Sequence, residues 1–272
     1  MSVVTAEKRR HLGSHIKMIL CGCYGRMGTA ITNMIDDMPD IEIALGTDRG
    51  ATNTPRPYPV RESIDGAAVS ADVIVSYLPP TAKEDTLALL DYSVKHKIPI
   101  VVCTTGFSAE MDAAIAEAAK ETAVFYSGNM SLGINVMTHI LKNVTGLLYA
   151  SGFDIEMIEK HHNKKIDAPS GTALMLLDAL KLAIQAPLKT VTDRSQALAA
   201  RGRDEIGVSA VRGGNIIGEH SVLFAGQNET IEITHAAQSR DVFADGTLKA
   251  VRFMFGKPAG FYNMQSLIES VE

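Results

Sequence analysis

The stretch 159–173 contains the densest group of chemically active side chains in the sequence. Three lysines and two histidines lie between Lys160 and Lys165, in a chain with a formal net charge of −5. This cluster suits an anionic substrate, and its histidines and lysines are proton donors whose pKa values neighbouring charges can shift toward neutrality. It leads into a Ser-Gly-Thr sequence at Ser170, where a predicted helix begins and could bind a carboxylate. A solvated charge run is the alternative, and helix capping by Ser170 is compatible with ligand binding.

A metal site is not expected at this cluster. Adjacent side chains on a strand point to opposite faces, so His161 and His162 could share a metal only if the strand breaks there. No nearby cysteine or carboxylate has a recognised ligand spacing. The other candidate ligands, His220 and His235, are interpreted as strand residues with satisfied hydrogen bonds.

A glycine-rich turn, Gly22-Cys-Tyr-Gly25-Arg-Met-Gly28, stands between a predicted strand and a predicted helix. Glycines allow a tight turn and a close approach to a pyrophosphate, and the helix N-terminus supplies free amide hydrogens. Asp48 ends the next predicted strand and could bind the adenosine ribose hydroxyls, whereas Arg49 could receive a 2′-phosphate. Both NADH and NADPH are therefore compatible with the sequence. A turn that serves only packing and an exposed charge pair are the alternatives.

The elements that would position these residues alternate regularly in the first half. Strands are predicted at 17–21, 41–46, 71–78, 98–105 and 123–129, with helices before Pro39, at 81–97 and at 108–121, the last capped by Ser108. This pattern predicts an α/β, Rossmann-like, doubly wound parallel sheet, whose carboxyl edge would carry Cys103–Gly106 and Ser127–Met130.

The second half predicts a smaller α+β domain with an open mixed sheet. Helices are expected at 132–148 and 172–185, and strands at 153–162, 207–214, 216–226 and 229–238. The Gly-Gly-Asn and Gly-Gln-Asn turns between the last three strands favour antiparallel pairing. A helix at 242–257 would return to the first domain. The expected organisation is a disordered leader at 1–15, a dinucleotide-binding domain at 16–130 and 241–272, and a substrate-binding and oligomerisation domain at 131–240.

Composition excludes several classes of protein. With 272 residues, 46% hydrophobic and 21% charged, the chain has an ordinary globular composition, and no apolar run approaches the length of about 20 residues that a spanning helix needs. The negative charge gives no general attraction to nucleic acid or to an anionic membrane. Three cysteines, Cys21, Cys23 and Cys103, fit neither a disulfide framework nor a zinc site. We therefore expect a cytoplasmic protein.

Motifs along most of the chain resemble the 4-hydroxy-tetrahydrodipicolinate reductase family, also called dihydrodipicolinate reductase, of the diaminopimelate and lysine pathway. The resemblance runs from about Lys17 to about Met264 and rests on GCYGRMG, CTTGF, GNMSLGINVM, EKHHNKKIDAPSGTAL, VRGGNIIGEHSVLFAG and EITHAAQSRDVFADG. The HH-x-x-K-x-DAPSGTA stretch is specific to the family, whereas the glycine turn would fit many dehydrogenases.

The resemblance implies a reaction and a set of site residues. Reduced nicotinamide would deliver hydride to a cyclic imine dicarboxylate formed by loss of water, giving tetrahydrodipicolinate. His161 and Lys165 would be catalytic. Substrate contacts would come from His162, Ser170, Gly171, Thr172, Thr105 and Arg240. Cofactor contacts would come from Gly22, Cys23, Tyr24, Gly25, Arg26, Met27, Asp48, Arg49, Cys103, Thr104, Thr105, Ser127, Gly128, Asn129 and Met130.

Some features keep other readings open. Tyr24 and Cys103 stand where glycine is common in the family, so the backbone contacts to the cofactor can differ. The family is typically a homotetramer built through sheets of the second domain.

Two other functions remain as alternatives to the reductase. They are another amino-acid-pathway dehydrogenase, such as a semialdehyde or homoserine dehydrogenase, and a non-catalytic NAD(P)-binding sensor.

Overall fold

The computed structural model describes residues 15–50, 55–67, 69–195 and 198–271. Except for His15, the leader expected at 1–15 lies outside these residues. The described chain forms two compact units. One contains the residues up to Met130 and those from Phe243 onward, and the other is Ser131–Val242. We refer to them as the first and second units.

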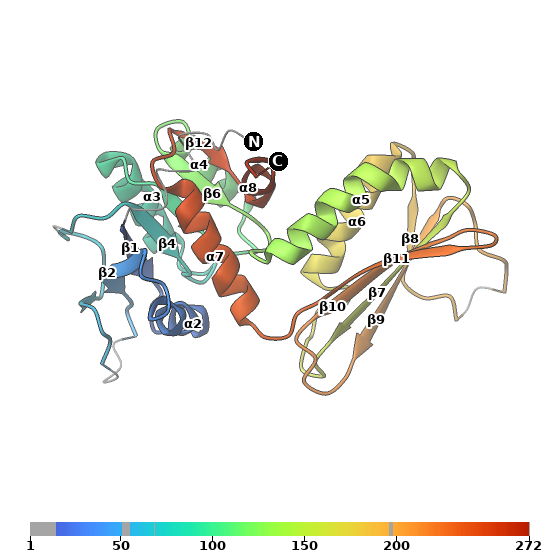
Figure 1. Ribbon diagram of the computed structural model, residues 1–272, viewed down its shortest axis with the longest axis horizontal. Coiled ribbons are helices and arrows are strands. Elements are labelled where there is room, and N and C mark those ends of the chain that lie inside the picture. The colour runs from blue at the N-terminus through green and yellow to red at the C-terminus, as the bar shows by residue number, and fades with distance from the viewer. Residues whose placement is uncertain (1–14, 51–54, 68, 196–197, 272) are drawn as a thin grey trace, which may run out of the picture. The chain divides into compact units, whose positions relative to one another are not determined.

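The first unit has a seven-stranded sheet in the order β12-β6-β5-β4-β1-β2-β3, and every pairing in it is parallel (Figure 1). Its elements are β1 (Ile16–Cys21), α2 (Arg26–Ile35), β2 (Ile41–Thr47), β3 (Val60–Arg61), β4 (Val73–Ser76), α3 (Lys83–His96), β5 (Ile100–Val102), α4 (Ala109–Ala118), β6 (Ala123–Tyr126), α7 (Asp241–Met254), β12 (Gly260–Tyr262) and α8 (Met264–Glu269). The predicted parallel sheet is confirmed. The short β3, β12 and α8 were not predicted.

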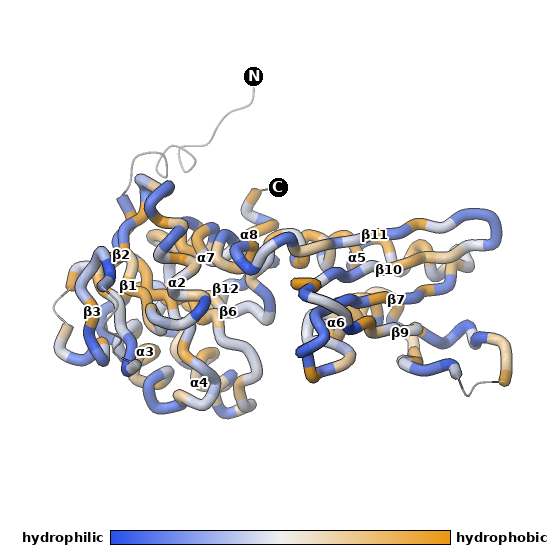
Figure 2. The backbone as a smooth tube through the Cα atoms, turned by 90° about the horizontal axis from the view of Figure 1, so that it is seen from below, coloured by the Kyte–Doolittle hydropathy of each residue, from blue (hydrophilic) through white to orange (hydrophobic). Residues whose placement is uncertain are grey.

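Helices pack on both faces of this sheet because successive strand residues point to opposite sides. Ile19 and Ile74 join a buried cluster with Leu89 of α3 and Met111 of α4. On the opposite face, Phe125 of β6 packs edge-on against Phe253 of α7 at 6.3 Å between ring centroids. The hydrophobic strands, including β1, are orange in Figure 2. The sheet is therefore doubly wound.

The C-terminal segment completes the sheet of the first unit. Arg252 of α7 donates to both carboxylate oxygens of Asp40, at 2.6 and 2.9 Å, just before β2 begins. After α7 the chain adds β12 beside β6. Residues distant in sequence thus form the same sheet.

The second unit has a five-stranded mixed sheet in the order β11-β10-β7-β9-β8. Its elements are α5 (Leu132–Ala150), β7 (Asp154–His161), α6 (Gly171–Ile184), β8 (Lys189–Val191), β9 (Glu205–Arg212), β10 (Glu219–Ala225) and β11 (Thr230–Ala236). Met137 and Leu141 of α5 and Leu176 of α6 form a buried cluster with Met157 of β7 and Val222 of β10. Both helices therefore cover one face of the sheet. The predicted mixed sheet is confirmed.

One predicted strand pairing is wrong. The turn at Gly213-Gly214-Asn215 was expected to join an antiparallel pair, but β9 pairs in parallel with β7 and β8. β10 instead pairs antiparallel with β7 and β11. Because β7 lies between β9 and β10, the turn passes the end of β7 and is not a hairpin. The antiparallel pairing expected for the next two strands, β10 and β11, is confirmed.

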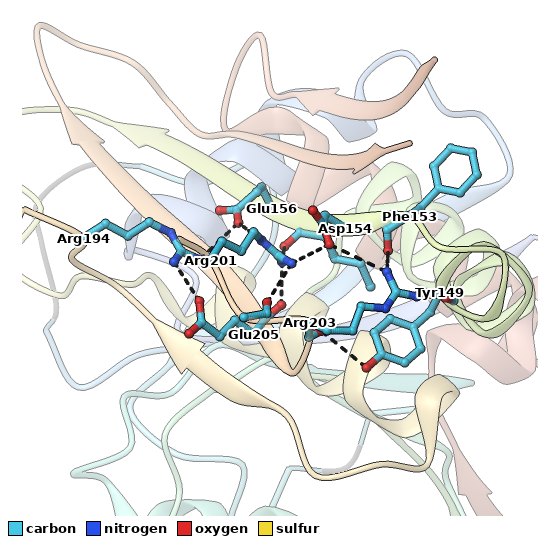
Figure 3. Close-up of polar contacts among 10 residues, drawn as sticks. Tyr149, Phe153, Asp154, Glu156, Arg194, Arg201, Arg203 and Glu205 are labelled. Atoms are coloured by element: carbon cyan, nitrogen blue, oxygen red, sulfur yellow. Dashed lines mark hydrogen bonds and ion pairs between the residues drawn. The ribbon is translucent and has the colours of Figure 1, made fainter. Parts of the chain in front are cut away.

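Three arginines hold the connector from β8 to β9 against the start of β7 (Figure 3). Arg201 donates to Glu156 Oε1 at 3.0 Å and to Asp154 Oδ1 at 2.6 Å. Arg194 donates to Glu205 Oε2 at 2.7 Å, and Arg203 donates to the carbonyl oxygen of Phe153 at 2.8 Å. These bonds tie the connector to the start of β7 and the start of β9, which lie side by side in the sheet.

Among the described residues, no helix combines the length and apolar character needed to cross a membrane.

We expect Gly28→Ala to destabilise the first unit by about 1–3 kcal/mol, because an added methyl group would lie 2.7 Å from Cys23 Cα and the backbone would have to shift. Urea unfolding followed by circular dichroism measures the change. Gly128→Ala is the matched control, since a Cβ at Gly128 meets no atom within 4 Å. Equal unfolding midpoints for the two variants would contradict this account of the turn.

Candidate functional site

Polar residues lie at one end of the sheet face that packs against α5 and α6 in the second unit. In β7 buried side chains alternate with partly buried ones, and on the buried face Met157 is followed by Glu159 and His161. Glu159 is the cross-strand partner of His220 in β10, and His161 is the partner of Arg212 in β9. Since directly paired residues lie on the same face of a sheet, these four polar side chains gather where the apolar core ends.

Glu159 is the centre of this group and is completely buried. Arg212 donates from Nη2 to Glu159 Oε1 at 2.7 Å and from Nη1 to Oε2 at 3.0 Å. The backbone amide of Ser170 donates to Oε1 at 3.1 Å, and His161 Nδ1 bonds to Oε2. Burial raises the pKa of the Glu159 carboxyl, but the hydrogen bonds from Arg212 and His161 outweigh it, and the net shift is downward.

The imidazole of His161 is held on two sides. Nδ1 is bonded to Glu159, and the His220 ring stands edge-on to it at 5.1 Å between centroids. Burial lowers the pKa of His161 and outweighs the opposite effect of Glu159, so the imidazole is neutral near neutral pH. A Cβ at Gly218 would lie 3.1 Å from Nε2, so any side chain at that position would crowd this nitrogen.

The loop between β7 and α6 carries Lys165 and His162. Lys165 Nζ lies 2.9 Å from Asp167 Oδ1, and this ion pair lowers the pKa of Asp167. Arg212 also donates to the carbonyl oxygen of Asp167 at 2.6 Å, which ties the loop to the buried group. His162 Nδ1 is buried and has no hydrogen-bond partner among the described residues.

The loop ends at Ser170, which caps helix α6. Its hydroxyl accepts from the amide of Ala173 at 3.2 Å and lies 3.2 Å from His220 Nε2, and its own amide bonds to Glu159. Ser170 is only 1% exposed, so its polar groups are engaged within the protein. Gly171 is exposed and Thr172 is half-buried at the first turn of the helix. The N-terminus of α6 is therefore accessible to solvent at these two residues.

Three residues of this cluster have the spacing of metal ligands. Glu159, His161 and His220 offer ligand atoms that lie within 4.8 Å of one another. Both oxygens of Glu159 are bonded to the Arg212 guanidinium, however, and a cation would have to displace that charge. The residues therefore do not fit a metal.

The prediction of satisfied hydrogen bonds for His220 and His235 is wrong in one respect. Each lies in a strand and has an Nε2 contact, to Ser170 and Ser131 respectively. In both, however, Nδ1 is buried without a hydrogen-bond partner in the described part of the chain. Burial lowers the pKa of His220 to about 4, so this ring remains neutral and can pack against His161.

In the first unit, the glycine turn has the geometry that its sequence predicts. Gly22 adopts a φ of +80°, and a Cβ there would lie 3.0 Å from the carbonyl oxygen of Tyr77. Gly25 is the N-cap of α2, and neither a side-chain cap nor an acidic first-turn residue is present. Within the described residues, the amides of Arg26, Met27 and Gly28 make no hydrogen bond to the protein. The turn therefore fits a phosphate-bearing ligand.

Asp48 and Arg49 follow β2, as expected. Asp48 accepts from the amides of Tyr24 at 2.9 Å and Gly50 at 2.8 Å, which joins the end of β2 to the glycine turn. Arg49 forms an ion pair with Asp85 of α3. A small cavity of about 50 Å³ adjoins this edge, and its lining includes Asp48, Arg49, Asp85 and Glu62.

The remaining predicted cofactor residues follow β5 and β6 in the first unit. Cys103 is partly buried, Thr104 is buried and donates to the carbonyl oxygen of Leu78 at 2.5 Å, and Thr105 is exposed. Ser127 donates to the carbonyl oxygen of Asn129 at 3.2 Å. Gly128 is exposed, while Asn129 and Met130 are buried. Arg240, a predicted substrate contact, is an exposed residue of the second unit.

The cysteines offer no nucleophile. Burial raises the pKa of Cys21 and Cys103 to about 12 and that of Cys23 to about 11, so all three remain protonated thiols at neutral pH. The structure therefore argues against a semialdehyde dehydrogenase that forms a thioester through one of them.

Two protein-family models together match nearly the whole described chain. Residues 16–130 match the model of the dihydrodipicolinate reductase N-terminus, and residues 133–268 match that of the C-terminus. The chain belongs to the dihydrodipicolinate reductase family. The predicted resemblance is confirmed, and with it the prediction of a reductase.

Individual relatives agree with this family. The chain is 45% identical over 255 residues to a 4-hydroxy-tetrahydrodipicolinate reductase of Clostridium tetani, covering 94% of this chain and 98% of that protein. It is 42% identical to the Staphylococcus carnosus reductase, covering 93% and 99%. A dipicolinate-bound dihydrodipicolinate reductase from Paenisporosarcina sp. TG-14 has a similar fold, with a TM-score of 0.74 and 19% identity over 91% of this chain and 97% of that chain.

Three polar residues of these sites were missed from the sequence. Glu159 and Arg212 form the buried group with His161, and the alternating pattern of β7, which places Glu159 in the same row as Met157, could have indicated the first of them. Arg56 donates to the carbonyl oxygen of Cys23 at 2.7 Å and to Thr29 Oγ1 at 2.8 Å, and it lies over the Tyr24 ring. No local pattern indicates Arg56, because it reaches the glycine turn from a distant loop.

We expect Asp85→Asn to strengthen NADPH binding relative to NADH by about twofold to fivefold. The substitution removes the ion pair that engages Arg49, and exposed ion pairs contribute about 0.2–1 kcal/mol. Quenching of nucleotide fluorescence on titration measures both dissociation constants. Glu110→Gln is the matched control, since it removes the exposed Lys83–Glu110 ion pair elsewhere in the unit. An unchanged ratio of the two constants in Asp85→Asn would contradict the role of this pair.

Proposed function

We propose that this protein reduces 4-hydroxy-tetrahydrodipicolinate, through dihydrodipicolinate, to tetrahydrodipicolinate with NADH or NADPH. The observation that supports the proposal most strongly is in the second unit, where His161, Lys165 and the first turn of α6 come from one short segment. Family membership and the names of the 42–45% identical relatives support the same reaction.

The chemistry requires an electron-poor ring and an added hydride and proton. Loss of water from the 4-hydroxy compound leaves a conjugated cyclic imine that carries two carboxylates. The reduced nicotinamide, when bound, supplies the hydride. The side chains of this protein must bind the carboxylates, stabilise the negative charge that develops on the ring nitrogen, and transfer protons.

The second unit offers residues for these tasks. The amides of Gly171 and Thr172 lie at the exposed start of α6, where a carboxylate is stabilised by the helix N-terminus. Lys165 supplies a cation for the developing charge and a proton for the ring nitrogen. His161 accepts or donates a proton at Nε2. His162 and Arg240 contact the substrate through further polar or positively charged groups. Ser170 caps α6 and so orients the amides that follow it.

The first unit would bind the nucleotide. We assign the pyrophosphate to the glycine turn and the first amides of α2, and the adenosine ribose to Asp48 and Arg49. Backbone and side chains after β5 and β6, from Cys103 to Thr105 and from Ser127 to Met130, complete this proposed site. Thr105 is also assigned to the substrate.

A homotetramer in the cytoplasm is proposed as the working form. The helices α5 and α6 lie on one face of the second unit's sheet, and the opposite face carries Ile158, Leu223 and the 44% exposed Val211. An uncovered sheet face of this kind suits association with further copies of the chain. Sedimentation equilibrium tests the proposal, and a monomer at micromolar concentration would refute it.

The reaction is tested by the loss of reduced-nicotinamide absorbance with the freshly formed condensation product of pyruvate and aspartate semialdehyde. We expect substrate-dependent oxidation of NADH, NADPH or both. Oxidation of neither, by protein shown to bind them, would instead favour a sensor or a different dehydrogenase.

Lys165→Ala should lower kcat by about 10²-fold or more, because a positioned proton donor and its charge are removed. Lys164→Ala is the control, as Lys164 is an exposed neighbour on the same loop. Steady-state kinetics on both variants, with circular dichroism to verify folding, measures the effect. Near-normal turnover in folded Lys165→Ala would remove Lys165 from the catalytic assignment.

A further inference from the structure

The buried carboxylate of Glu159 has its hydrogen-bonding capacity filled. An ionised carboxylate offers about four lone-pair positions, and it only accepts hydrogen bonds. In this protein four donors surround it: two Arg212 nitrogens, the Ser170 amide and His161 Nδ1. The guanidinium and the amide can act only as donors.

This arrangement determines the state of the His161 ring. With Arg212 and Ser170 donating to it, Glu159 is ionised and carries no proton to give to the ring. The contact between Glu159 Oε2 and His161 Nδ1 is then a hydrogen bond only if Nδ1 carries the proton. In the neutral imidazole the lone pair therefore lies on Nε2.

The surroundings of Nε2 suit a proton acceptor. In the part of the chain that the structure describes, Nε2 makes no hydrogen bond, and it lies beside Gly218, where a side chain would crowd it. The charged and titratable groups around the ring are Glu159 on β7, Arg212 on β9, His220 on β10, and Lys165 and Asp167 on the loop before α6. Glu159 alone among them is in direct hydrogen bond with the ring.

We propose that Glu159, held by Arg212, is a positioning residue that fixes the His161 tautomer and orientation and so makes Nε2 a base. The inference rests on the proposed function, because it assigns a role within that reaction. A carboxylate that orients a catalytic imidazole is a general device, and its removal leaves the ring free to adopt the wrong tautomer. The Arg212 guanidinium keeps the carboxylate ionised, and through the Asp167 carbonyl it also holds the loop that carries Lys165.

The test is the pH dependence of kcat and kcat/KM in Glu159→Gln. We expect kcat to fall by about 10²-fold with little change in KM, since the substrate contacts remain. Glu159 raises the pKa of His161, so its loss should also move the acidic limb of the kcat/KM profile to lower pH. Glu219→Gln is the matched control. It removes the carboxylate that pairs with Lys160 at 2.5 Å on the other face of the same two strands, and it should leave both quantities unchanged.

A second variant separates positioning from stability. Glu159→Gln leaves the partly buried Arg212 guanidinium without its carboxylate partner, which destabilises the fold. In the double variant Glu159→Gln, Arg212→Met this charge is also removed, so we expect the thermal unfolding midpoint to recover at least partly while kcat remains about 10²-fold low.

The outcomes distinguish a failure of the positioning role of Glu159 from a failure of the proposed function. Turnover that recovers with stability in the double variant would overturn the positioning role, as would an unchanged kcat and acidic limb in folded Glu159→Gln. If the unsubstituted protein does not reduce the substrate, the proposed function fails instead.

Discussion

The ion pair between the buried Glu159 carboxylate and the partly buried Arg212 guanidinium is the interaction on which the second unit's site depends. A carboxylate without any exposure is costly to ionise unless charged donors surround it, and here a bidentate guanidinium, a backbone amide and an imidazole do so. Each of these donors belongs to a different part of the site. The amide begins α6, the guanidinium holds the Lys165 loop through the Asp167 carbonyl, and the imidazole is the candidate base. One buried charge therefore sets the relative positions of the proposed catalytic and substrate-binding groups.

The sheet explains why these groups meet. Parallel pairing of β7 with β9 places Arg212 beside His161, and antiparallel pairing of β7 with β10 places His220 beside Glu159. A hairpin between β9 and β10 would have left no place for β7 between them. The arginine cluster around Arg201 ties the connector before β9 to the opposite end of β7, where that strand begins. The strand order that differs from the sequence-based expectation is thus the order that assembles the buried group.

The sequence predicted most of the fold because both units follow local patterns. Alternation of apolar runs with helical periods indicated the parallel sheet, and the glycine turn and Ser170 were recognised from residues close together in the chain. What it missed depends on pairing between distant segments. β12 has only three residues and is stabilised by its neighbour β6, and Arg212 and Arg56 reach their partners from loops or strands far away in sequence. The HH-x-x-K motif identified the catalytic candidates, but it could not show that Ser170 is engaged internally with Glu159 and His220.

The most direct test of the central claim is the ¹⁵N chemical shifts of His161 in protein labelled at histidine, assigned with a His161→Gln variant. At neutral pH the account predicts a protonated Nδ1 and an unprotonated Nε2, and it predicts that this preference weakens in Glu159→Gln. A proton on Nε2 in the unsubstituted protein, or the same tautomer with and without the Glu159 carboxylate, would contradict it.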